Sequence, residues 1–206
     1  MTLSNIVVDG KPIGLPDAGQ GWHTDMSYLD TPPDASMLYA LEIPPTGGNT
    51  WFCGMQAACD ALPDDLKARL AHARVVHDYE KLWEHMRVAK GSSRPALTDE
   101  QRRLRPPATH PIFLTHPITG RKVLYCNPGY ATRIGGMDRA ESDALLDMLY
   151  RHSETPEFQC RFVWQPNSIA FWDNRAAMHH AMWDYFPHKR LGYRVTVKGD
   201  KPFYRA

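Results

Sequence analysis

Prolines restrict how this chain can fold more than any other feature. The 206 residues include 17 prolines, which are spread along the whole sequence. Proline lacks a backbone N–H and clashes with the preceding turn of a helix, so frequent prolines exclude long helices. A chain of this length can still bury a substantial core, and 43% of its residues are hydrophobic. We therefore expect a single domain, residues 1–206, built from many short elements.

Most of these elements are predicted to be strands, because short segments are rich in β-branched and aromatic residues. Two of the strands flank the sequence HPITGR and predict a hairpin with Gly120 in its turn. Helices are predicted at 64–71 and after Asp138, where Glu141 occupies a capping-box position. The pattern indicates a mostly β fold, a sandwich or barrel with helical insertions. The predicted strands are 36–43, 74–79, 111–115, 122–126, 158–164, 168–172 and 191–198.

Composition excludes several classes of partner. Lys and Arg number 24 against 23 Asp and Glu, so the formal net charge of +1 favours neither nucleic acid nor an anionic membrane. No apolar run approaches the roughly 20 residues that a membrane-spanning helix needs. The opening MTLSNIVVDGKP contains no signal segment, so we expect a cytoplasmic protein. The four cysteines form no CxxC pair, which is typical of reduced, packed thiols.

Histidine is the commonest metal ligand, and the chain has ten. His23 and Asp25 stand two residues apart in WHTD. In an extended strand, positions i and i+2 point to the same face, so both side chains can reach one metal ion. The triplet is weak by itself, since a hydrogen-bonded structural histidine is the commoner meaning.

A second histidine site lies near the other end of the chain, at His179 and His180. One distant histidine would complete two His and one carboxylate, the arrangement of non-haem Fe(II) oxygenases. Spacing leaves both residues open, although adjacent strand residues cannot point the same way. Nearby, Asp173 and Arg175 belong to a WDNR turn, where a structural ion pair is the simpler interpretation.

Arg190 and Arg194 form the third candidate pair. If residues 191–198 are a strand, the even separation places both guanidinium groups on one face. A guanidinium is suited to bidentate binding of a carboxylate or sulfonate. A solvated strand face carrying two arginines is the alternative interpretation, and spacing alone does not separate the two.

These residues lie in blocks that resemble taurine dioxygenases, within the wider family of 2-oxoglutarate-dependent Fe(II) dioxygenases. The resemblance covers nearly the whole chain and implies a double-stranded β-helix, or jelly-roll, in agreement with the strand-rich pattern. The matching blocks are WHTD from Trp22, TPP from Thr31, TGGNT at 46–50, HPITGRKVLYCNPGYATRI at 116–134, WQPNSIAFWDNRAAMHHA at 164–181 and the final GDKPFYRA.

The resemblance implies a role for each metal candidate. His23, Asp25 and His179 match the family's iron ligands, and would therefore be both the metal ligands and the catalytic centre. His180 takes the place of the tyrosine that follows the second histidine ligand. The implied enzyme uses Fe(II), 2-oxoglutarate and O2, and produces succinate and CO2.

The anion-binding candidates are also assigned by the resemblance. Thr50 and Arg190 match the residues that hold the far carboxylate of 2-oxoglutarate, and Arg194 matches the arginine that holds the substrate sulfonate. The implied reaction hydroxylates a small anionic substrate. Taurine or a related sulfonate is the best expectation, and its hydroxylation would release sulfite and an aldehyde.

Several positions depart from the taurine dioxygenase pattern. Gly19 stands in place of an asparagine, Tyr130 in place of a phenylalanine, and Met26 in place of a smaller residue. Tyr130 and Met26 are therefore predicted to line an altered substrate site. The segment before the HxD is shorter than in the family, so we expect an N-terminally shortened jelly-roll. An edge strand exposed by that shortening would favour a homo-oligomer.

Three alternatives remain beside a taurine-type dioxygenase. A catalytically inactive, truncated jelly-roll remnant fits the short N-terminal part but not the complete set of iron and cosubstrate residues. The same chemistry on a sulfate ester or a carboxylate fits the altered substrate positions. A zinc hydrolase fits the ligand set but leaves Thr50 and Arg190 without a role.

Overall fold

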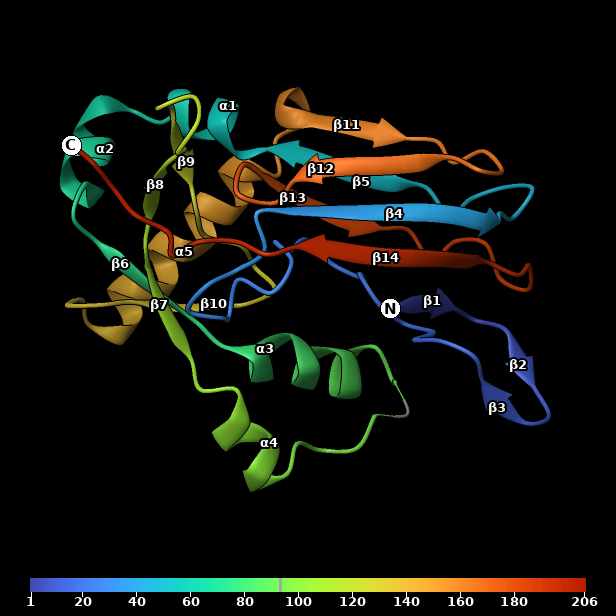
Figure 1. Cartoon of the computed structure of the whole chain (residues 1–206). Coiled ribbons are helices and arrows are strands. Elements are labelled where there is room, and N and C mark those ends of the chain that lie inside the picture. The colour runs from blue at the N-terminus through green and yellow to red at the C-terminus, as the bar shows by residue number, and fades with distance from the viewer. Residues whose placement is uncertain (93) are drawn as a thin grey trace.

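Two antiparallel sheets form the centre of the computed structural model, which describes residues 1–92 and 94–206 (Figure 1). Strands that are distant in the sequence pair within each sheet, as in a jelly-roll, and this confirms the predicted mostly β fold. The larger sheet has the order β1 (Thr2–Ser4), β14 (Leu191–Val197), β4 (Ala35–Glu42) and β12 (Ile169–Asp173). The smaller sheet has the order β11 (Gln159–Phe162), β5 (Thr50–Gly54) and β13 (Ala177–Ala181).

Side chains on the inner faces of the two sheets pack against each other. Leu38 and Ala40 of β4 and Trp172 of β12 are buried in one apolar cluster. Phe52 of β5 packs against that cluster, and its ring centroid lies 5.3 Å from that of Trp172. The functional side chains described below lie between the same two faces.

The outer face of the larger sheet is also apolar. Tyr39 of β4 pairs with Ile169 of β12 on one side and with Tyr193 of β14 on the other. Phe171 and Val195 lie two residues further along the same two strands and point to the same face. All four of these flanking side chains are more than half exposed. A strand with apolar side chains on both faces has a nearly continuous apolar sequence. These segments therefore show little alternation between apolar and polar residues.

The remaining elements lie at one end of the sheets and below them (Figure 1). Strands β10 (Ala131–Ile134), β6 (Arg74–His77) and β7 (Ala108–Pro111) form a third sheet. Strands β8 (Phe113–Thr115) and β9 (Lys122–Leu124) form a hairpin, and β2 (Val7–Val8) pairs with β3 (Lys11–Pro12). The helices are α1 (Met55–Asp60), α2 (Asp64–Leu70), α3 (Tyr79–Glu84), α4 (Asp99–Leu104) and α5 (Arg139–Ser153), with a π-helical turn at His85–Ala89 and a 3-10 turn at Pro156–Phe158.

Helix α5 illustrates how local sequence produces an element. The Asp138 carboxylate accepts a hydrogen bond from the Glu141 N–H at 2.9 Å and so caps the first turn. Leu145, Leu146 and Leu149 then recur at helical spacing and are buried in the larger apolar core. The predicted helix after Asp138 is confirmed, as is the helix at 64–71.

The predicted hairpin is also confirmed, since Phe113 pairs with Leu124 across β8 and β9. One predicted strand, 111–115, is wrong as a single element. Pro111 ends β7 and pairing resumes at Phe113, because the N–H of Ile112 donates to the Ala73 carbonyl instead. Sequence reasoning missed β1, β2, β3, β5, β10 and β13, most of β7, and the six-residue helices, all of which are too short to show a clear period.

The described residues bear on two expectations, one about membrane-spanning helices and one about the cysteines. None of their helices is long and apolar enough to cross a membrane. The cysteines are free thiols, as predicted: Cys53, Cys59 and Cys126 are buried and Cys160 is exposed.

Leu149 of α5 belongs to the larger apolar core. Leu149→Ala removes a side chain that is 0% exposed, so the lost burial and the remaining cavity should destabilise the fold by about 2–5 kcal/mol. Urea denaturation measures this change. Ile118→Ala is the control, because Ile118 is 79% exposed and its truncation should have little effect. Equal losses in the two variants would contradict the described core.

Candidate metal centre and anion pocket

His23, Asp25 and His179 meet between the two sheets. Each offers a ligand atom, and these three atoms all lie within 4.8 Å of one another. Asp25 Oδ1 lies 3.6 Å from His23 Nε2 and 3.9 Å from His179 Nε2. All three side chains are buried. Two imidazole nitrogens and a carboxylate oxygen that face one another out of water are a donor set for a divalent transition metal.

The backbone around the first two of these residues is not a strand, contrary to the expectation. His23 makes a single bridge to His179, with N–H to carbonyl hydrogen bonds of 3.0 and 2.8 Å. Met26 then has φ +54, a left-handed conformation that ends the extended segment. Asp25 is therefore fixed by something other than a strand partner.

The side-chain amide of Asn174 supplies the missing backbone partners of Asp25. Its Oδ1 accepts from the Asp25 N–H, and its Nδ2 donates to the Asp25 carbonyl, both at 2.9 Å. The Ser36 hydroxyl on β4 donates to Asp25 Oδ2 at 2.7 Å. Sequence reasoning missed both residues, because nothing local connects them with a residue so far away in the sequence.

Neighbouring groups keep Asp25 ionised, and burial keeps His179 neutral. Burial acts to raise the pKa of Asp25, but the His179 and His23 imidazoles and the Arg194 guanidinium outweigh it, and the pKa falls below its usual range. Burial, aided by His23, lowers the pKa of His179 to about 3. An ionised carboxylate and a neutral imidazole are the forms in which Asp and His side chains bind metals.

The structure also separates the two adjacent histidines. His179 faces His23, with 4.2 Å between the ring centroids, and its other ring neighbours include Trp172 at 4.9 Å. His180 is turned away and packs edge-on against Trp22 at 5.7 Å. Strand β13 places alternate residues on opposite faces, so only one of the two can point at Asp25.

Arg190 and Arg194 both line one pocket that includes His179 and Thr50. Arg194 lies in β14, and Arg190 lies just before that strand. Both arginines line the same pocket, as expected, although they do not belong to one regular strand. Apolar side chains make up most of the wall, and none of the described residues in the lining is acidic.

The two arginines differ in their partners. Nη1 of Arg194 donates to Asp25 Oδ1 at 2.6 Å. Arg190 forms no ion pair with any carboxylate of the described residues and instead lies near the rings of Trp164 and Tyr185, at 5.7 and 5.8 Å from the centroids. The Thr50 hydroxyl accepts from Trp164 Nε1 at 3.0 Å, which leaves its own proton free to donate. The pocket therefore combines a cation that has no carboxylate partner among the described residues with a hydroxyl donor.

The three positions that depart from the family pattern surround the metal candidates. Gly19 lines the pocket at φ +81, where a Cβ would lie 3.2 Å from that of Ala181. The Tyr130 ring meets His23 edge-on at 6.2 Å but does not line the Arg190 pocket. Met26 follows Asp25 directly and is also outside that lining.

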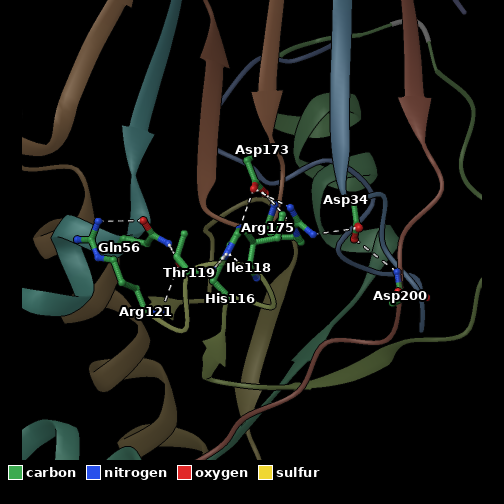
Figure 2. Close-up of polar contacts among 9 residues, drawn as sticks. All are labelled: Asp34, Gln56, His116, Ile118, Thr119, Arg121, Asp173, Arg175 and Asp200. Carbon is green, nitrogen blue, oxygen red and sulfur yellow. Dashed lines mark hydrogen bonds and ion pairs between the residues drawn. The ribbon is translucent and has the colours of Figure 1, made fainter.

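The WDNR turn between β12 and β13 is held by an ion network (Figure 2). Asp173 accepts from Arg175 at 2.9 Å and from His116 Nε2 at 2.8 Å, and Arg175 also donates to Asp34 at 3.0 Å. Nδ1 of His116 accepts from the N–H groups of Ile118 and Thr119, so its proton lies on Nε2. The structural ion pair considered for Asp173 and Arg175 is present.

Two buried histidines support the segment that follows Asp25. Nε2 of His110 donates to the carbonyls of Ser27 and Leu29, both at 2.9 Å, and Nδ1 of His77 lies 3.0 Å from the Ser27 hydroxyl. Both side chains are 0% exposed. Burial lowers the pKa of His77 to about 3, and it also lowers that of His110.

The fold and the site together give a jelly-roll with a candidate mononuclear metal centre, and comparison with known proteins places the chain more closely. Residues 2–196 match the family described as "Taurine catabolism dioxygenase TauD, TfdA family". The chain belongs to this family.

The chain is similar to several characterised or solved members. It is 37% identical over 185 residues to an alpha-ketoglutarate-dependent 2,4-dichlorophenoxyacetate dioxygenase of Burkholderia sp. (strain RASC), covering 86% of this chain and 60% of that protein. It is 33% identical over 186 residues to an alpha-ketoglutarate-dependent sulfonate dioxygenase of Saccharomyces cerevisiae, covering 88% and 43%. A crystal structure of AAD-2 in complex with Mn(II) and N-oxalylglycine matches with a TM-score of 0.78 and 35% identity, covering 88% of this chain and 68% of that one. The chain thus spans about half the length of these curated relatives.

The buried histidines predict how stability depends on pH. The pKa of His77 is about 3 in the fold but about 6.5 in an unfolded chain, so the unfolded state binds more protons between these values. Stability is therefore full above pH 6.5 and falls as the pH drops toward 3, by at most about 1.4 kcal/mol per pH unit for each such histidine.

Urea unfolding at pH 7, 6 and 5 measures this slope. His77→Gln removes one of the proton-binding sites and should make the decline shallower. The exposed His72→Gln is the matched control and should keep the wild-type slope. A slope unchanged in His77→Gln would show that this histidine does not resist protonation in the fold.

Proposed function

We propose that this chain is an Fe(II)- and 2-oxoglutarate-dependent dioxygenase that acts on a small anionic organic substrate. The observation that carries the proposal is the pocket whose lining includes Arg190, Thr50 and His179, the last being one of the three residues whose ligand atoms lie within 4.8 Å of one another. A metal centre beside a cationic, otherwise apolar pocket suits a chelating dianion such as 2-oxoglutarate.

The metal candidates fit iron in their donor set. His23, His179 and Asp25 would hold Fe(II) on one face, as in the two-histidine, one-carboxylate sites of oxygenases. Bound iron would supply the oxygen chemistry that no amino-acid side chain provides. The chain's own contribution is to keep the His179 imidazole neutral and the Asp25 carboxylate ionised at a buried site.

The cosubstrate would be held at its far end by Arg190 and Thr50. Partial burial of the Arg190 guanidinium without an ion-pair partner among the described residues costs free energy, which an anionic ligand offsets. The apolar wall, with Leu38 and Trp164, leaves few other places for a charged group to bind. The oxo-acid end would then point toward the metal in one orientation.

Arg194 would position the substrate anion. Its guanidinium has five N–H donors, and the contact with Asp25 engages Nη1, so further donors remain for a sulfonate or carboxylate. Tyr130 and Met26 would shape the rest of the substrate site beside His23 and Asp25.

Taurine or a related sulfonate is the proposed substrate, with succinate, CO2, sulfite and an aldehyde as products. Relatives are named for sulfonate and for 2,4-dichlorophenoxyacetate substrates, so a carboxylate substrate is the second candidate. The departures at Gly19, Tyr130 and Met26 favour a substrate different from taurine itself. We further propose that the chain acts as one domain in the cytoplasm and forms a homo-oligomer.

Anaerobic titration tests the dioxygenase proposal. Fe(II) followed by 2-oxoglutarate should produce a visible charge-transfer band from the chelate on wild-type protein. His179→Ala should lose the band and all succinate formation, since it removes one of three ligands. If wild type binds iron without a band, or if His179→Ala makes succinate at the wild-type rate, the proposal is wrong and an inactive jelly-roll becomes the better account.

Substitutions of Arg190 and Arg194 should weaken the binding of different ligands. Arg190→Ala is expected to weaken 2-oxoglutarate binding about 10- to 150-fold, the loss of one charge-assisted contact of about 1.5–3 kcal/mol. Arg194→Ala should weaken taurine binding by a similar factor and leave 2-oxoglutarate affinity nearly intact. Calorimetry on the metal-loaded protein measures both, and the reverse pattern would mean that the two roles are exchanged.

A further inference from the structure

We infer that Asn174 is a positioning residue for the metal centre, which sets the Asp25 carboxylate toward His23 and His179. The inference rests on the proposed function only for the presence of a metal at these three side chains. Asn174 itself touches neither a reacting atom nor any of the three ligand atoms.

The Asn174 amide binds the Asp25 backbone through both its N–H and its carbonyl. Asn174 is 0% exposed, and its amide makes three hydrogen bonds of 2.9 Å. Two of them bind the N–H and the carbonyl of Asp25, and the third binds the carbonyl of Pro33. This is the pairing that a neighbouring strand would provide. Because the chain leaves the extended conformation at Met26, the amide replaces a strand in fixing Asp25.

Asn174 lies in the turn that leads into β13. His179 lies on that strand, five residues further along, so one short segment fixes the backbone of Asp25 and carries the second histidine. His179 and His23 are in turn linked by two backbone hydrogen bonds. The backbones of all three ligand residues are thereby connected to this turn.

The turn is itself anchored on both sides (Figure 2). Asp173 binds His116 from the β8–β9 hairpin, and Arg175 binds Asp34 just before β4. The Asn174 N–H also donates to the Asp34 carbonyl at 2.9 Å. An amide on a turn held in this way has little freedom, so its geometry is passed to Asp25.

Metal affinity separates positioning from a merely structural role. Outer residues that orient metal ligands typically change metal affinity by 10- to 100-fold when removed. A residue that only cross-links segments lowers stability and leaves the affinity of the folded protein unchanged. The probe is Mn(II) alone, titrated into metal-free protein and followed by the EPR signal of the free ion, with urea unfolding measured in parallel.

Asn174→Ala should weaken Mn(II) binding at least tenfold. Ser142→Ala is the matched control, because Ser142 is also 0% exposed and accepts a buried hydrogen bond from the Ile134 N–H, away from the site. It should lose stability without losing Mn(II) affinity. Asn174→Ser, whose hydroxyl can make one of the three bonds, should fall between wild type and Asn174→Ala.

Arg175→Ala keeps the amide but removes the ion pairs with Asp173 and Asp34, and should weaken Mn(II) binding severalfold. Affinity within twofold of wild type in folded Asn174→Ala overturns the inference and leaves the proposed function intact. Should neither Asn174 variant fold, unchanged affinity in Arg175→Ala overturns it. Wild-type protein that binds no Mn(II) refutes the metal centre, and the inference with it. Mn(II) binding without 2-oxoglutarate binding refutes the dioxygenase proposal alone.

Discussion

The buried carboxylate of Asp25 is the group on which the arrangement of this protein depends. It is 2% exposed and ionised, and a charge in that position is stable only when surrounding groups replace water. Those groups come from separate parts of the fold: Ser36 on β4, Arg194 on β14 and His179 on β13. The Asp25 carboxylate is therefore surrounded by its partners only when the two sheets pack against each other, and the same packing assembles the site.

Only one of the two arginines in the pocket has a carboxylate partner among the described residues. Arg194 is paired with Asp25, so it helps to keep that carboxylate ionised. Arg190 has no carboxylate partner among the described residues and lies among aromatic rings. A pocket with a fixed cation and no acidic side chain among the described lining residues attracts anions and disfavours cations, which suits the acidic cosubstrate proposed above.

Local patterns predicted the elements that have strong local signals. The capped helix after Asp138, the helix at 64–71 and the hairpin around Gly120 are all present. Strands β5 and β13 were missed, because TWFCG and AMHHA are short and show no alternation. The expected strand at WHTD is a loop, because the pairing of Asp25 is supplied by a side chain far away in the sequence.

Residue types alone defined the chemistry available here: imidazoles and a carboxylate for a metal, guanidinium groups for an anion, and a mostly β chain to hold them. Tertiary structure decided which of these groups meet. It turned His179 rather than His180 toward Asp25, and it gave Arg194 but not Arg190 a carboxylate partner. It also brought Asn174 to Asp25. Such choices depend on the register and packing of strands distant in sequence, which short-range conformational preferences do not encode.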